Sequence, residues 1–251
     1  MKHCFSDAHI HISDIKNWQP VNNSPVCSCA HSVKEYEILQ KLKNIYPECI
    51  EIAYGIHPQN PDINQMEFLN NLVVQNKINV IGEAGFDLYT AEFAGHLQEQ
   101  EAVWNFQLDL AVKYNKILVV HCRKALDKIY TYTKQLSKLP AVVFHSFPGS
   151  PAEATGFIKR GVNAYFSLGK QLLNGNKRAL SCAGQLPVER ILLETDAPYQ
   201  TLKGQEFTPA QDIIQVYEEF SKIKNMSLEA VCENVEKNFL KVFGKDCGIK
   251  I

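Results

Sequence analysis

The sequence predicts a single α/β domain built as an eight-stranded β/α barrel, in either a regular or a distorted form. The chain has 251 residues, which is close to the length of about 250 that such barrels typically need. Short apolar runs alternate with longer segments of helical periodicity, as repeated strand–helix units around a parallel sheet do. Eight such runs can be counted, which is the number of strands that closes a small barrel.

The eight predicted strands follow one another along the whole chain. The second is the least regular, because Pro25 and two cysteines are unusual in a central strand. The predicted strands are Cys4–Ile12, Ser24–Ala30, Ile50–Gly55, Asn79–Gly82, Ile117–His121, Ala141–His145, Ala164–Ser167 and Arg190–Glu194.

Helices are predicted between the strands and after the last one. Apolar residues recur at helical spacing in Gln98–Tyr114 and in Leu228–Phe243. Ser150-Pro151-Ala152-Glu153 and Thr208-Pro209-Ala210-Gln211 both have the sequence of a capping box with proline at the first helical position.

Composition excludes several classes of protein. The chain is 45% hydrophobic and 21% charged, with a net charge of −1. A protein that binds nucleic acid through bulk charge is usually far more basic, so any such contact must be local.

The eight cysteines form no C-x-x-C pair and predict free thiols in a reducing compartment. No signal peptide or membrane span is predicted, and no obligate protein partner is evident, so we expect a cytoplasmic protein.

Polar residues at strand ends carry the functional prediction. The carboxyl ends of all strands in a β/α barrel meet at one face, where active sites lie. Five of the predicted strands end on residue types that bind metals, and these residues are His9, His11, Glu83, His121, His145 and Asp196.

Strand order predicts how these residues group. His9 and His11 are two residues apart and point to the same side of a strand. The first and eighth strands are neighbours in a closed barrel, so Asp196 can join them. The fourth to sixth strands are consecutive, so Glu83 can link that pair to His121 and His145. Mixed nitrogen and oxygen donors favour zinc or manganese over calcium.

Structural roles compete with this interpretation. A single histidine after an apolar run is often a hydrogen-bonded core residue, and a single acid can cap a helix. Five such strand ends on one face favour a metal site, because burying that many polar groups without a cation is costly.

Residues near the strand ends predict substrate contacts. Arg123 could meet an anion or form a surface ion pair. His57 closes the third strand and could touch substrate or pack on Pro58. Asp7 and Glu194 could orient the metal ligands or form a salt bridge, whereas we expect His31 to be structural.

Six motifs together resemble the TatD family of metal-dependent deoxyribonucleases, within the wider amidohydrolase superfamily. They extend over nearly the whole chain, so the resemblance implies one TatD-like hydrolase domain over residues 1–251. The motifs are Asp7-Ala8-His9-Ile10-His11, Gly55-Ile56-His57-Pro58, Gly82-Glu83-Ala84-Gly85-Phe86-Asp87, His121-Cys122-Arg123, Phe144-His145-Ser146-Phe147 and Glu194-Thr195-Asp196-Ala197-Pro198-Tyr199.

The resemblance implies a TIM barrel with two divalent metal ions, either zinc, magnesium or manganese. His9, His11 and Asp196 would hold one ion, His121 and His145 the other, and Glu83 both. The implied activity is hydrolysis of DNA ends, including 3′–5′ exonuclease action, with Asp196 and Glu83 as catalytic residues.

The sequence departs from the family after Tyr199. An arginine and a short N-x-P motif often follow there, but this chain has Gln200–Pro209 without either. Lys203 could replace the arginine, although a lysine does not reproduce its bidentate contacts.

An alternative is an amidohydrolase acting on a small amide or ester, in which the metals polarise a carbonyl. Such enzymes often have a carboxylated lysine at the position that contacts both metal ions. Here that position is Glu83, which argues against the amidohydrolase. A barrel that has lost catalysis and only binds is the third alternative.

Overall fold

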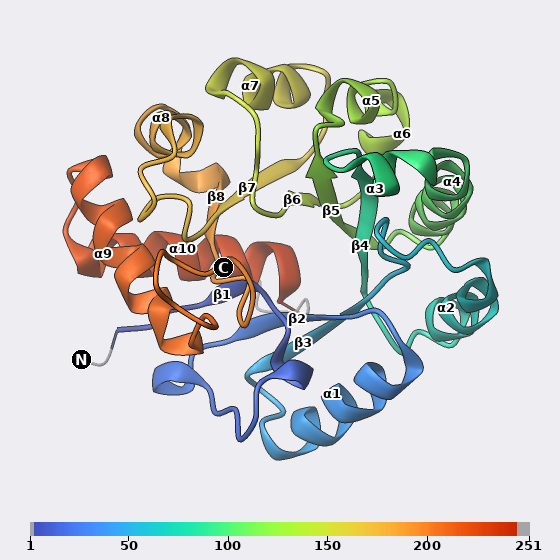
Figure 1. Cartoon of the computed structure of the whole chain (residues 1–251). Helices are drawn as coiled ribbons and strands as arrows, with labels where there is room; N and C mark the ends of the chain where they lie inside the picture. The colour runs from blue at the N-terminus through green and yellow to red at the C-terminus, as the bar shows by residue number, and fades with distance from the viewer. Residues whose placement is uncertain (1–2, 245–251) are drawn as a thin grey trace, which may run out of the picture.

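The computed structural model of the protein describes residues 3–244 and shows a β/α barrel (Figure 1). One parallel sheet contains all eight strands, in the order in which they occur along the chain. The strands are β1 (Asp7–Ile10), β2 (Val26–Ala30), β3 (Ile50–Tyr54), β4 (Val80–Asp87), β5 (Ile117–Arg123), β6 (Val142–Phe144), β7 (Ala164–Leu168) and β8 (Ile191–Leu193). The predicted fold class and all eight predicted strands are confirmed.

Helices surround the ring of strands. They are α1 (Val33–Ile45), α2 (Met66–Val74), α3 (Ala91–Gly95), α4 (Leu97–Lys113), α5 (Leu126–Tyr130), α6 (Thr133–Leu136), α7 (Pro151–Lys159), α8 (Lys177–Gln185), α9 (Ile213–Lys224) and α10 (Leu228–Phe243). Single 3₁₀ turns occur at η1 (Ile12–Asp14), η2 (Val21–Asn23), η3 (Ile63–Gln65), η4 (Val188–Arg190) and η5 (Ala210–Asp212). The two helices predicted from periodicity are α4 and α10.

One of the two predicted capping boxes is confirmed. Ser150 accepts a hydrogen bond from the Glu153 N–H, and the Glu153 side chain accepts one from the Ser150 N–H. The prediction for Thr208 was wrong, because Pro209 caps η5 there and no side chain completes the cap. The Thr208 hydroxyl instead accepts a hydrogen bond from Nζ of the buried Lys170 at 3.0 Å.

The barrel interior is apolar at one end and polar at the other. Inward-facing residues such as Cys27, Ala53 and Val143 form a buried cluster with Phe239 and Phe243 of α10. Nδ2 of Asn238 donates hydrogen bonds to the carbonyls of Val188 and Ile191, near the start of β8. Helix α10 therefore covers the end where the strands begin, and the end where they finish is left for polar side chains.

Strand β4 differs from its prediction. Glu83 does not end the strand, which continues to Asp87 with a register shift against β5 between Ile81 and Ala84. Gly85 makes this possible, because a Cβ atom at this position would lie 1.9 Å from the His121 carbonyl oxygen. The close approach of two backbones places Glu83 inside the barrel mouth instead of at its rim.

The barrel closes between β8 and β1. The Asp196 N–H donates to the His9 carbonyl at 2.9 Å, and the His11 N–H donates to the Ala197 carbonyl at 2.8 Å. These hydrogen bonds bring residues almost 190 positions apart in the sequence into direct contact. All seven cysteines within residues 3–244 are free; Cys247 lies outside the described residues.

The close approach at Gly85 can be tested by substitution. We expect Gly85→Ala to lower the free energy of unfolding by about 3 kcal/mol or more, because the added methyl meets backbone that cannot move away. Urea denaturation measures the change. Gly184→Ala on α8 is the control, because its Cβ would lie 4.0 Å from the nearest atom and should leave stability unchanged or raise it slightly. Equal stability of both variants would contradict the close approach.

Candidate metal centre

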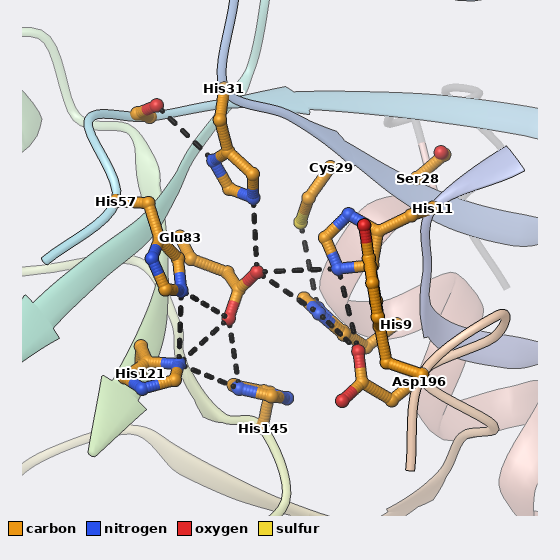
Figure 2. A network of polar contacts seen from close by, with 12 residues as sticks. His9, His11, Ser28, Cys29, His31, His57, Glu83, His121, His145 and Asp196 are labelled. Carbon is orange, nitrogen blue, oxygen red and sulfur yellow. Dashed lines mark hydrogen bonds and ion pairs between the residues drawn. The ribbon is translucent and has the colours of Figure 1, made fainter. Parts of the chain in front are cut away.

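Six of the eight histidines of the chain gather around one carboxylate, that of Glu83 (Figure 2). Alternation along the strands explains why. Val119 and His121 face inward from β5, and Val143 and His145 from β6, so each histidine extends the inward-facing row of its strand. The distances from the six imidazoles to Glu83 lie between 2.9 and 3.6 Å.

The first donor set lies on the side of Oε1 of Glu83. Nε2 of His9 is 3.3 Å from Oε1 of Glu83 and 3.4 Å from Oδ1 of Asp196. Nε2 of His11 is 3.4 Å from both of these oxygens. The predicted group of His9, His11 and Asp196 is therefore together in the structure, with Glu83 as its fourth member.

The second donor set lies on the side of Oε2 of Glu83. Nδ1 of His121 is 3.0 Å from Oε2, and Nε2 of His145 is 2.9 Å from the same atom. The two histidine nitrogens are 3.3 Å apart. Glu83 thus gives one oxygen to each set, as strand order suggested.

The geometry of the first set fits a divalent cation. Two ligand atoms about 2.1 Å from an ion in a tetrahedral arrangement lie about 3.4 Å apart, which matches the distances from Nε2 of His9 and of His11 to Oε1 of Glu83 and Oδ1 of Asp196. Nε2 of His9 is buried and has no hydrogen-bond partner among residues 3–244, although two carboxylate oxygens lie close to it. Such an unpaired polar atom is costly unless a cation binds it. The cluster is therefore suited to divalent metal binding.

Electrostatics within the cluster also favour a cation. Burial lowers the pKa of His11, but hydrogen bonds to Asp196 and Glu83 and their charges outweigh it and raise this pKa to about 10. Burial raises the pKa of Glu83, but His9, His145 and His57 outweigh it and hold that pKa well below its ordinary value. The carboxylates of Glu83 and Asp196 thus favour positive charge on the groups around them.

Two acids were expected either to orient the ligands or to form a salt bridge, and the structure separates their contacts. Oε1 of Glu194 lies 3.5 Å from Nδ1 of His145 and accepts hydrogen bonds from the N–H and hydroxyl of Ser146. Asp7 instead accepts hydrogen bonds from the N–H and hydroxyl of Thr195, at 3.1 and 2.6 Å. Glu194 is thus next to a ligand imidazole, whereas Asp7 holds the segment that carries Asp196.

The cavity over the cluster measures about 670 Å³ and includes two of the three predicted substrate residues. Arg123 lines it, and its guanidinium lies over the ring of Tyr89, 4.2 Å from the centroid. His57 also lines it, and burial lowers its pKa to about 3. Lys203 is exposed in a turn and does not line the cavity.

Sequence reasoning missed several residues of the site. Asp87 places Oδ2 3.2 Å from Nε2 of His121, and Gln200 donates to Oδ2 of Asp196 at 2.8 Å. His31, expected to be structural, lies 3.1 Å from Oε1 of Glu83. A signal existed for His31, because Cys27, Cys29 and His31 alternate along one inward-facing row that continues past the end of β2.

Three comparisons place these features among known proteins. The family described as "TatD related DNase" matches residues 6–244. A "3'-5' ssDNA/RNA exonuclease TatD" from Escherichia fergusonii is 32% identical over 185 residues, which cover 71% of this chain and 68% of that protein. An "Uncharacterized metal-dependent hydrolase" from Mycoplasma pneumoniae is 27% identical over 221 residues, 82% of this chain and 83% of its own.

Solved structures confirm the fold. The TatD homologue YJJV from Escherichia coli superposes with a TM-score of 0.82 at 20% identity, covering 96% of this chain and 98% of its own. A TatD family hydrolase from Entamoeba histolytica gives a TM-score of 0.79 at 19% identity, with 98% and 100% coverage. No helix within residues 3–244 has the length and apolarity to cross a membrane.

Glu83 contributes to both donor sets, so its charge can be tested directly. We expect Glu83→Gln to lower the affinity for zinc at least about 10-fold, because the variant keeps the size of the side chain but loses the shared negative charge. Competition with a chromophoric chelator measures the affinity. Asp14→Asn is the control, since Asp14 lines the same cavity but contacts Tyr199. Unchanged zinc affinity in Glu83→Gln would contradict the assignment of this carboxylate.

Proposed function

The chain belongs to the TatD-related DNase family of metal-dependent hydrolases, and from this premise we propose that it hydrolyses phosphodiester bonds at the 3′ ends of DNA strands. The observation that carries the proposal is the convergence of two donor sets on Glu83 beneath a cavity that Arg123 lines. The 3′–5′ exonuclease name of its relatives supports the choice of substrate. The proposal treats residues 1–251 as one such domain.

We propose that two divalent ions, either zinc, manganese or magnesium, are held here. His9, His11 and Asp196 would hold one, His121 and His145 the other, and Glu83 both. When bound, such ions activate a water molecule near neutral pH and offset the charge of the phosphate.

Asp196 is the proposed proton acceptor. Its Oδ1 faces His9 and His11, at 3.4 Å from each. Its Oδ2 accepts a hydrogen bond from Gln200 at 2.8 Å, which holds the plane of the carboxylate relative to the ligands. Asp196 lines the cavity, so its carboxylate can take a proton from water that reaches the substrate.

Arg123 is the proposed phosphate ligand. Its side chain is 47% exposed at the cavity, and its Nη1 is 3.8 Å from Oδ2 of Asp87. A guanidinium matches phosphate geometry with two parallel hydrogen bonds. With a net charge of −1, the chain has no excess of cations to hold a long strand, so binding is local and weakened by salt.

The cavity volume favours the end of a strand over a continuous duplex. A volume of about 670 Å³ is typical of sites that enclose a small molecule and suits a terminal nucleotide. The alternative amidohydrolase reaction has less support. Glu83 occupies the position between the two donor sets, and no lysine within residues 3–244 lines the cavity.

The decisive experiment is a hydrolysis screen. A 3′-labelled single-stranded DNA is incubated with magnesium, manganese or zinc, beside a small phosphodiester and a set of amides. Release of labelled mononucleotide is expected. Hydrolysis of amides alone would favour the amidohydrolase alternative, and no DNA cleavage with any metal at high enzyme concentration would reject the nuclease.

His121 tests the second donor set. We expect His121→Ala to reduce DNA hydrolysis about 100-fold while thermal unfolding stays close to that of the wild type, because the residue lies at the polar end of the barrel. Activity and circular dichroism melting measure the two effects. Unfolding of this variant would show that the residue belongs to the stabilising core instead.

Arg123 and Lys203 can be compared in the same assay. We expect Arg123→Ala to raise the KM for DNA about 10-fold, because a charge-assisted contact to phosphate is lost. Lys203→Ala should have the smaller effect, since Lys203 is exposed outside the cavity lining. A larger effect at Lys203 would move the phosphate site to the turn that carries it.

A further inference from the structure

Two histidines beyond the six predicted ligands flank Glu83, and their hydrogen bonds distinguish them. His31 follows β2 and lies 3.1 Å from Oε1 of Glu83. His57 follows β3 and lies 3.6 Å from Oε2. Each offers an imidazole nitrogen near another histidine and Glu83, in the groups His11, His31, Glu83 and His57, Glu83, His121.

The outer nitrogen of His31, which is the ring nitrogen that points away from Glu83, faces an atom that can only accept hydrogen bonds. Nδ1 of His31 is 3.4 Å from the carbonyl oxygen of Gly55 (Figure 2). A carbonyl only accepts hydrogen bonds, so Nδ1 carries a proton and Nε2 is the nitrogen whose lone pair is left to bind a cation. That lone pair points at a carboxylate oxygen, which also only accepts. A cation between the two atoms makes this contact favourable.

The outer nitrogen of His57 faces a donor instead. The backbone N–H of Gln59 donates to Nδ1 of His57 at 3.2 Å. Nδ1 is therefore the unprotonated nitrogen, and the proton of the neutral ring is on Nε2. Nε2 of His57 thus presents an N–H toward Oε2 of Glu83, 3.6 Å away, and has no lone pair for a metal.

His31 also shares the arrangement of the predicted ligands. Nε2 of His121 faces Asp87, and Nδ1 of His145 faces Glu194, so in each ring the outer nitrogen meets an acceptor and the inner nitrogen faces Glu83. Ligand histidines generally have such an outer partner. The position of His31 is held as well, because its backbone N–H donates to Oε2 of Glu35 at 2.7 Å, beside the N-cap of α1.

We infer that His31 is an additional metal ligand on the Oε1 side of Glu83, and that His57 is not a ligand but a neutral hydrogen-bond donor. His31 then adds an imidazole beside His11 on the Oε1 side of Glu83. Additional nitrogen donors favour zinc, cobalt and nickel over magnesium, which prefers oxygen. The site is therefore selective for a late transition metal.

The inference rests on the metal-dependent site proposed above, but its test measures metal binding and not turnover. Zinc and magnesium affinities are determined by competition for the wild type, His31→Ala, His31→Gln and His57→Ala. Visible absorption of the cobalt-loaded proteins reports the number of nitrogen donors. The His31 side chain is 20% exposed, so its removal does not empty the core, and melting curves verify folding.

In both His31 variants we expect zinc affinity to fall at least about 10-fold and the cobalt spectrum to change, with magnesium affinity altered less than about threefold. His57→Ala should lower the zinc affinity less than the His31 variants do and should keep the cobalt spectrum of the wild type, because no nitrogen donor is lost. Unchanged zinc affinity in both His31 variants, or equal losses for zinc and magnesium, would overturn the ligand assignment. A loss at His57 equal to that at His31 would overturn the tautomer argument.

The two proposals fail separately. If DNA is not cleaved but zinc affinity depends on His31, the proposed substrate is wrong and the ligand assignment stands. If DNA is cleaved while zinc affinity is independent of His31, the nuclease stands without this ligand. A wild-type protein that binds no zinc would overturn the ligand assignment.

Discussion

The burial of the Glu83 carboxylate is the constraint on which the rest of the site depends. Its side chain is only 3% exposed and has six imidazoles within 3.6 Å. A buried, unpaired carboxylate costs several kcal/mol, so the surroundings must supply positive charge. Imidazoles can do so by taking up protons or by holding cations, and carboxylates on both sides of the cluster favour cations. The same negative potential that stabilises protonated histidines therefore defines the metal centre.

Barrel architecture provides the scaffold for this charge. The apolar end of the interior is filled by strand residues and by Phe239 and Phe243 of α10, which gives the strands fixed positions. His31, His121 and His145 then need only to occupy the next inward-facing places along their strands. Gly85 allows β4 to approach β5 closely, and the contacts between β8 and β1 bring Asp196 to His9. Packing at one end of the barrel thus determines the geometry at the other.

Charge is concentrated in the site and nearly balanced over the chain as a whole. Such a distribution suits a hydrolase that captures one phosphate at the end of a strand, since the chain as a whole has no excess of positive charge to hold a long polyanion. Hydrogen bonds to the outer nitrogens of the histidines also decide which ring nitrogen carries the proton. They determine which rings present a lone pair to a cation and which present a proton to a neighbour, so chemically identical side chains take different roles.

The sequence by itself determined the barrel and predicted that six candidate ligands meet at one face, because apolar runs and the residues that close them are local features and the barrel order places neighbouring strands together. It did not determine where β4 ends, because the polar Glu83-Ala84-Gly85 segment has the composition of a turn and only its pairing with β5 keeps it extended. Nor did it show which outer nitrogen faces an acceptor and which faces a donor in His31 and His57. That distinction depends on the carbonyl of Gly55, just after β3, and on the backbone N–H of Gln59 in the loop that follows, whose directions are set only in the folded barrel.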